Sequence, residues 1–170
     1  LDLAVVAVPD LAGDPGLRRE HLFFNDPVVV CRKGHPMSHA RRLAELVDCE
    51  WMTTGPAHAV LGSAVLEGFQ RQGIVPRRVI QCDMGWALQS LLVRSDRLCV
   101  LPRAVLEQPV LGEILQRLPI DEQLPQYAIC LVYRDDEPLM PMAKQMATLL
   151  RRHAHYLAKP RTPSPATASR

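Results

Sequence analysis

The segment from Arg77 to Leu106 constrains the fold more than any other part of this 170-residue chain. Its pattern predicts an apolar strand over 77–82, a helix over 84–94 and a second strand over 98–101. A helix that joins two short apolar strands is typical of a βαβ unit in a parallel sheet. In open sheets of that kind, ligands bind beyond the carboxyl ends of the strands, where helices begin. The segment therefore predicts a small-molecule site at 82–85.

The rest of the chain also alternates between strand and helix patterns. Leu3–Val8 is a continuous apolar run, which predicts a strand buried on both faces. Further strands are expected over 21–32, 50–54, 113–118 and 126–134, and helices over 40–47, 59–72, 103–107 and from Pro141 onward. The expected buried face of the last helix carries Met142, Met146, Leu149, Leu150, His153 and Leu157.

This order of elements predicts an α/β chain with two lobes. Residues 26–108 would form one lobe, and residues 1–25 and 109–158 would pair in the other. Two strands would cross between the lobes, so that a hinged cleft lies between them. Residues 159–170 are rich in Pro, Ser, Thr and Ala and are expected to be a disordered tail.

The charge of the chain argues against direct binding to nucleic acid. Residues 138–170 hold six of the 20 basic residues and no acidic ones, which leaves 14 basic against 18 acidic residues in 1–137, a net charge of −4. Affinity for DNA depends on neutralising phosphates, so a body of that sign binds it poorly. No apolar run reaches the roughly 18 residues of a membrane-spanning helix, and we expect no membrane contact.

Cysteines and histidines show no metal-ligand spacing. The five cysteines are Cys31, Cys49, Cys82, Cys99 and Cys130. Their odd number and mostly apolar surroundings favour reduced thiols in the cytoplasm over disulfides. His35 and His39 are separated by Pro36 and are expected in a surface loop. We also find no nucleophile elbow, P-loop or dinucleotide motif, and so expect neither a metal, nor a cofactor, nor an enzyme.

Four segments carry a set of motifs in a defined order: 1–5 (LDLAV), 27–37 (PVVVCRKGHPM), 91–102 (LLVRSDRLCVLP) and 127–143 (YAICLVYRDDEPLMPMA). In this order they resemble the C-terminal effector-binding domain of LysR-type transcriptional regulators. Many members of that family have a Gly-rich turn before the Leu-Pro pair. Here Ser-Asp-Arg at 95–97 stands in its place and is expected to form a tight polar turn instead.

The resemblance extends to about residue 155 and implies a type 2 periplasmic-binding-protein-like fold with two lobes and a hinge. The first lobe would be incomplete, because the family's opening βαβα stretch has no counterpart before Leu1. An apolar patch would then be exposed on Leu3–Val8 and 126–134. The resemblance also implies a homodimeric or homotetrameric regulator that contacts DNA only through an N-terminal helix-turn-helix absent from this sequence.

The predicted effector site begins with the residues between the strand at 50–54 and the next helix. Free backbone N–H groups at the helix start, together with two hydroxyls, could hold a carboxylate or a similar anion. The alternative is that Thr54 only caps the helix. Residues 82–86 form the equivalent junction one unit later, where the resemblance implies side chains that face the cleft.

At this second junction, Met84 and Trp86 suit an apolar or aromatic effector. Asp83 could instead only cap the helix, and Trp86 could belong to the core. The resemblance adds the end of the first strand as a cleft wall. The candidate effector-binding residues are Val8, Pro9, Thr53, Thr54, Gly55, His58, Cys82, Asp83, Met84 and Trp86.

The sequence thus favours a sensor in which a small anionic metabolite binds between two lobes and shifts their arrangement by its differential affinity. One alternative is the solute-binding protein of a transporter, which has the same fold. Another is an enzyme built on the same lobes, for which only Asp83 and His58 offer acid–base groups. An upstream helix-turn-helix would support the regulator, whereas an upstream signal peptide would support the transporter.

Overall fold

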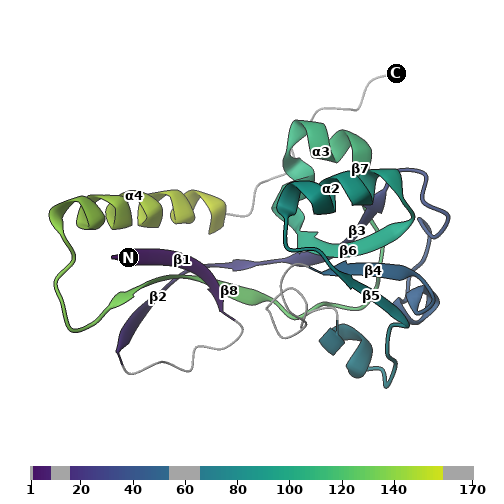
Figure 1. Ribbon diagram of the computed structural model, residues 1–170, viewed down its shortest axis with the longest axis horizontal. Helices are drawn as coiled ribbons and strands as arrows, with labels where there is room; N and C mark the ends of the chain where they lie inside the picture. Colours follow the sequence, from purple (N-terminus) through teal and green to yellow (C-terminus); the bar gives the residue numbers. More distant parts are fainter. Residues whose placement is uncertain (1, 9–15, 54–65, 159–170) are drawn as a thin grey trace. The chain divides into compact units, whose positions relative to one another are not determined.

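The computed structural model describes residues 2–8, 16–53 and 66–158 of the chain. The chain divides into two compact units (Figure 1). Unit 1 consists of residues 1–24 and 128–170, and unit 2 consists of residues 25–127. The chain therefore passes from one unit to the other twice.

This division differs from the predicted lobes in residues 109–127. We expected that segment with the N-terminal strand, but it belongs to unit 2. It begins with the helix α3 (Pro109–Ile114), which replaces part of the strand predicted over 113–118. The short strand β7 (Leu115–Arg117) follows and pairs antiparallel with β3 (Pro27–Arg32), so backbone hydrogen bonds fix the segment to unit 2.

Unit 2 is built around a five-stranded mixed sheet of order β5-β4-β6-β3-β7. Strand β4 (Glu50–Thr53) runs parallel to both of its neighbours, β5 (Arg78–Gln81) and the central strand β6 (Arg97–Pro102), while β3 runs antiparallel to β6. Helix α2 (Gly85–Arg94) joins β5 to β6. The βαβ unit predicted from the sequence is thus confirmed, with β4 lying between its two strands.

Both faces of the unit 2 sheet are buried along β3, β4 and β6, whereas the edge strand β5 is exposed. Side chains alternate along a strand, so neighbouring residues of β3 and β6 enter different clusters. One cluster includes Val29, Cys31, Leu43, Leu46, Trp51, Phe69, Leu98 and Val100. The other includes Val28, Val30, Met52, Leu88, Leu92, Cys99, Leu101 and Leu115. The Trp51 ring lies edge-on to Phe69 with centroids 5.3 Å apart, and its indole N–H donates to the Leu46 carbonyl.

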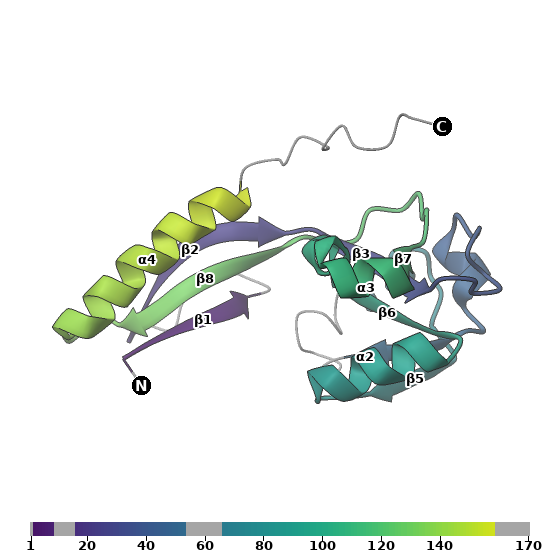
Figure 2. The ribbon, with the colours of Figure 1, turned by 90° about the horizontal axis from the view of Figure 1, so that it is seen from above.

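Unit 1 is a three-stranded sheet covered by one long helix. The sheet order is β1-β8-β2, with β1 (Leu3–Val8) antiparallel to β8 (Tyr127–Arg134) and β2 (Leu17–Asn25) on the other side. Helix α4 (Pro141–Ala158) lies along this sheet (Figure 2). Its first position is proline, which is tolerated there because the missing N–H has no helical partner.

The buried face of α4 differs from the predicted one. Ala143, Ala147 and Ala154 are at most 8% exposed, whereas Met142 is 76% and Met146 51% exposed. Leu149 and His153 are exposed as well, Leu150 is half-buried, and the side chain of Leu157 lies outside the described residues. The methionine stripe and the alanine stripe are one residue apart and share the helical period. Hydrophobicity predicted that the larger side chains would be buried, but the small side chains pack against the sheet.

Strand β1 also departs from its prediction. It was expected to be buried on both faces, but Val5 and Val6 are 47% and 38% exposed. As an edge strand it has a partner on one side only, β8. Apolar side chains of this strand are therefore exposed, as predicted, but Val5 and Val6 are successive residues and point to opposite faces of the sheet, so they do not form one patch. The predicted exposure does not extend over β8, where Ala128, Cys130 and Leu131 are buried at the centre of the sheet.

The remaining elements are short. A 3-10 helix, η1 (Leu43–Leu46), stands where a helix over 40–47 was predicted, and a second one, η2 (Arg103–Glu107), matches its predicted bounds. Residues 66–70 are helical, in agreement with the end of the helix predicted over 59–72. The predicted tail over 159–170 lies outside the described residues. None of the helices in the described ranges has the length and apolar character needed to cross a bilayer.

Candidate functional site

Two of the predicted site segments meet at one edge of the unit 2 sheet. Thr53 ends β4 and Cys82 follows β5, and these strands are parallel, so their carboxyl ends lie side by side. The Cys82 backbone N–H donates to the Thr53 carbonyl over 2.8 Å, which fixes the two strand ends together. Thr53 is 4% exposed. This is the sheet edge at which open α/β folds bind their ligands.

Helix α2 begins at this edge without a side-chain cap. Its N-cap is Met84, in an extended conformation, whose side chain makes no capping hydrogen bond to the first turn. The prediction that Asp83 might only cap the helix is therefore wrong. The Asp83 carboxylate instead accepts hydrogen bonds from the Gln81 side chain at 3.0 Å. The first-turn N–H groups of α2 have no acceptor within the helix and can serve an anion.

Two large apolar side chains flank these N–H groups. Met84 is 54% and Trp86 67% exposed, so Trp86 does not belong to the core. Exposed methionine and tryptophan side chains offer a polarisable surface for an apolar or aromatic molecule. The half-buried Cys82 thiol lies 3.7 Å from the Met84 carbonyl oxygen. The junction therefore combines hydrogen-bond donors for an anion with a surface for an apolar group.

The other predicted residues do not all come to this place. Thr53, Cys82, Asp83, Met84 and Trp86 share one edge of unit 2. Val8 belongs to unit 1, at the end of β1, where it pairs in register with Ala128. The predicted residues Pro9, Thr54, Gly55 and His58 lie outside the described residues.

Reactive cysteine chemistry is not supported beneath this edge. Cys99 is 1% exposed in the core next to Cys82. Burial, with a smaller contribution from the Cys82 thiol, raises the pKa of Cys99 to about 12. At neutral pH a thiol with that pKa is protonated and is a poor nucleophile.

A second hollow in unit 2 lies at the opposite ends of the same strands. Its volume is about 330 Å³, and it is lined in part by Glu50, Arg78 and Arg97 at the starts of β4, β5 and β6. Glu50 pairs with Arg97 at 3.0 Å and with Arg78 at 3.5 Å, so one carboxylate engages both guanidinium groups.

His35 also lines this hollow, and the prediction that it lies at the surface is wrong. It was expected in a surface loop with His39, but His35 is 3% exposed and only His39 is exposed. The His35 Nδ1 atom accepts a hydrogen bond from the Met37 N–H over 3.0 Å, which fixes the turn after β3. Within the described residues no group of three His, Cys, Asp or Glu side chains could hold a metal ion.

Comparison with known families decides between the possible readings of this fold. Residues 1–155 match the family described as LysR substrate binding domain. This chain belongs to that family. The HTH-type transcriptional regulator GbpR of Azospirillum brasilense is 24% identical over 155 residues, which are 89% of this chain and 45% of that protein. The chain thus spans less than half the length of this relative.

Solved structures agree with the family and confirm the predicted periplasmic-binding-protein-like α/β fold. The regulatory domain of Synechocystis PCC6803 CcmR in complex with 2-PG superposes with a TM-score of 0.71 at 20% identity, over 90% of this chain and 73% of that domain. The effector-binding domain of QuiR in complex with shikimate gives a TM-score of 0.72 at 18% identity, over 91% and 72%. LysR-family proteins are transcriptional regulators, and the solute-binding alternative is accordingly disfavoured.

Proposed function

We propose that this chain is the effector-binding part of a LysR-type transcription regulator, and that its unit 2 binds a small carboxylate at the start of helix α2. The observation that carries the proposal is the uncapped first turn of α2 beside Thr53 and between two exposed apolar side chains, Met84 and Trp86. A helix start whose N–H groups are free, beside the carboxyl ends of parallel strands, can bind an anion.

In the proposed complex, the first-turn N–H groups donate to the carboxylate of the effector. Its apolar body lies against Trp86 and Met84. Shikimate, present in the QuiR structure, is a carboxylate with a ring of suitable size for such a surface. Thr54, Gly55 and His58 follow β4 directly in the sequence and remain proposed parts of the site, while Val8 and Pro9 remain predictions from the family resemblance.

The proposed mechanism is a shift in conformational populations and contains no catalytic step. An effector that binds one conformation better than another stabilises it by that difference in affinity. The change would reach the operator through a DNA-binding domain outside this sequence, in a cytoplasmic homo-oligomer. The net charge of −4 over residues 1–137 agrees with a domain that does not itself contact DNA.

The test uses Gly85, the first helical residue of α2. Gly85→Pro removes one first-turn N–H, and proline is tolerated at the first position of a helix. The preceding residue, Met84, has φ −97° and ψ 110°, which is compatible with a following proline. Gly85→Ala is the matched control, because it keeps the N–H and its Cβ meets no atom within 4 Å.

Binding of shikimate and of benzoate to the intact protein would be measured by calorimetry. We expect Gly85→Ala to bind whichever of these two carboxylates the natural sequence binds, and with the same affinity. Gly85→Pro should bind about tenfold or more weakly, because a hydrogen bond to a charged group contributes about 1.5–3 kcal/mol. Equal affinities of the two variants for a probe that binds would contradict the anion site.

The same proposal predicts the response of the regulator. Thr53→Ala and Met84→Ala in the intact protein should alter the response to inducer and leave basal operator binding intact. Operator binding would be measured by gel shift with and without inducer. An unchanged inducer response in both variants would remove these residues from the site.

A further inference from the structure

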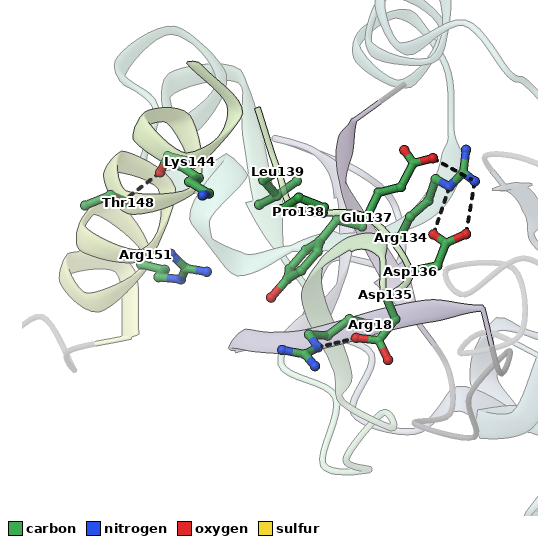
Figure 3. A pocket seen from close by; sticks show the side chains of 11 residues that line it. Arg18, Arg134, Asp135, Asp136, Glu137, Pro138, Leu139, Lys144, Thr148 and Arg151 are labelled. Carbon is green, nitrogen blue, oxygen red and sulfur yellow. Dashed lines mark hydrogen bonds and ion pairs between the residues drawn. The ribbon is translucent and has the colours of Figure 1, made fainter. Parts of the chain in front are cut away.

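Unit 1 contains a pocket that none of the predicted site residues lines. Its volume is about 600 Å³, within the range of pockets that hold small metabolites. The lining side chains come from the start of β2, the end of β8, the loop at 135–139 and residues 144–151 of α4 (Figure 3). The pocket thus joins β2, near the start of the chain, to β8 and α4, more than 100 residues later.

Two guanidinium groups at this pocket are held in fixed positions by carboxylates. Arg18 Nε lies 2.7 Å from Asp135 Oδ1. Arg151 donates to both carboxylate oxygens of Glu20, at 2.7 and 2.8 Å. The side chain of Tyr133, near the end of β8, lines the same pocket. Its hydroxyl is a further hydrogen-bond donor for an acceptor bound there.

Lys144 differs from the other cations of the pocket. In the described part of the chain it makes no ion pair, although it lies about two turns before Arg151 on α4. The third arginine, Arg134, is engaged by Asp136 at 3.1 Å and by Glu137 at 3.6 Å. Figure 3 shows Lys144 and Arg151 on the α4 side and the Arg134 cluster on the opposite side.

We propose that this pocket is a second binding site, for a small anion with a carboxylate or phosphate group, which Lys144, Arg151, Arg18 and Tyr133 hold. The ammonium group of Lys144 supplies the charge that no protein carboxylate neutralises. The tyrosine hydroxyl and the pre-positioned guanidinium groups supply directed donors. This inference does not depend on the proposed site at α2, which lies in the other unit.

Occupation of this site would link α4 to β2 and β8. The anion would bridge side chains of the helix to side chains of the two strands beneath it. A ligand that binds only the folded form raises its stability in proportion to RT ln(1 + [L]/Kd). Unit 1 would therefore become more stable as the concentration of the anion rises.

The test measures the melting temperature of the intact protein against inorganic phosphate and, separately, against malonate, at constant ionic strength set with sodium chloride. We expect a saturable rise in melting temperature with at least one of the two anions. The anion that gives the rise shows whether the site recognises phosphate or carboxylate. Lys144→Gln should weaken the apparent affinity about tenfold or more, since it removes a charged donor. Tyr133→Phe should weaken it by a smaller factor.

Arg152→Gln is the matched control, because it removes the same charge from an exposed position of α4 that does not line the pocket. It should bind the anion as the natural sequence does, and Gly85→Pro should do so too. A rise that never saturates, or that is equal in Lys144→Gln and Arg152→Gln, would be general salt stabilisation and would overturn the site. Melting without anion shows whether each variant is folded.

Discussion

Unit 2 and unit 1 bury their apolar residues in different ways. Unit 2 encloses its sheet between two clusters of large side chains, with Trp51, Phe69 and Leu92 all fully buried. Unit 1 covers its sheet with one helix, whose buried residues are alanines. Burial of a large apolar side chain contributes about 1.5–3 kcal/mol, and an alanine methyl far less. The interior of unit 2 is therefore the stronger source of stability.

This difference between the units shows where the spacing of large apolar residues predicts burial correctly. Large apolar residues at regular spacing were assigned correctly wherever both sides of a sheet are covered. They were assigned wrongly on α4, where the close approach of helix and sheet favours small side chains. Unit 1 in turn carries bidentate and close ion pairs at its surface, such as Arg151–Glu20.

The largest expected effect is in the core of unit 2. Trp51→Ala removes a side chain that is 0% exposed, its edge-on contact with Phe69 and its hydrogen bond to Leu46. The free energy of unfolding should fall by about 3–5 kcal/mol. Urea unfolding followed by circular dichroism measures the change. Trp86→Ala, at a residue 67% exposed, should cost less than about 0.5 kcal/mol, and equal costs would show that the two tryptophans are not distinguished by burial.

A smaller effect is expected from overfilling unit 1. Ala147 is 0% exposed beneath α4, so Ala147→Leu forces a larger side chain against the sheet. We expect a loss of about 1–3 kcal/mol in the free energy of unfolding. The neighbouring Met146→Ala should change it by about 0.5 kcal/mol or less, because Met146 is 51% exposed. A larger loss of stability in Met146→Ala than in Ala147→Leu would show that α4 buries the methionine face predicted from the sequence.

The smallest effect concerns the ion pairs of unit 1. Hydrogen bonding with Arg151 lowers the pKa of Glu20. A carboxyl whose pKa is lowered by folding contributes stability above its unfolded pKa of about 4.3, and that contribution is lost as the pH falls through its folded pKa. The pair is partly exposed, so the contribution should stay below about 1 kcal/mol.

Thermal unfolding at pH 7 and at pH 3 measures this contribution. In Arg151→Gln, melting should be lowered slightly at pH 7, and the difference from the natural sequence should be smaller at pH 3. A difference between the two proteins that is as large at pH 3 as at pH 7 would mean that Arg151 acts by packing, as the stem of an arginine can. Arg151 would then count among the residues that stabilise the fold by packing and not among those that stabilise it by an ion pair.

The candidate site at α2 could be predicted in part. The strand end predicted at Cys82 and the helix start predicted at Met84 follow from the break in hydrophobic pattern, and the structure has them within one residue, at Gln81 and Gly85. The role of Asp83 could not be predicted, because the same residue can cap a helix or accept from Gln81, and only the local backbone decides. The pocket in unit 1 had one signal, the absence of acidic residues after Glu137, which leaves Lys144 without a partner on its own helix.

The sequence by itself determined most of the order of strands and helices, the βαβ unit and membership in the LysR family, because these depend on local pattern and on motifs in order. Tertiary structure alone decided that α4 turns its alanines inward, that residues 109–127 join unit 2 through β7, and that Arg18, Tyr133, Lys144 and Arg151 share a pocket. Each of these depends on which surfaces lie close enough to pack or pair. Helical and strand periods do not contain that information, since adjacent stripes of a helix have the same period.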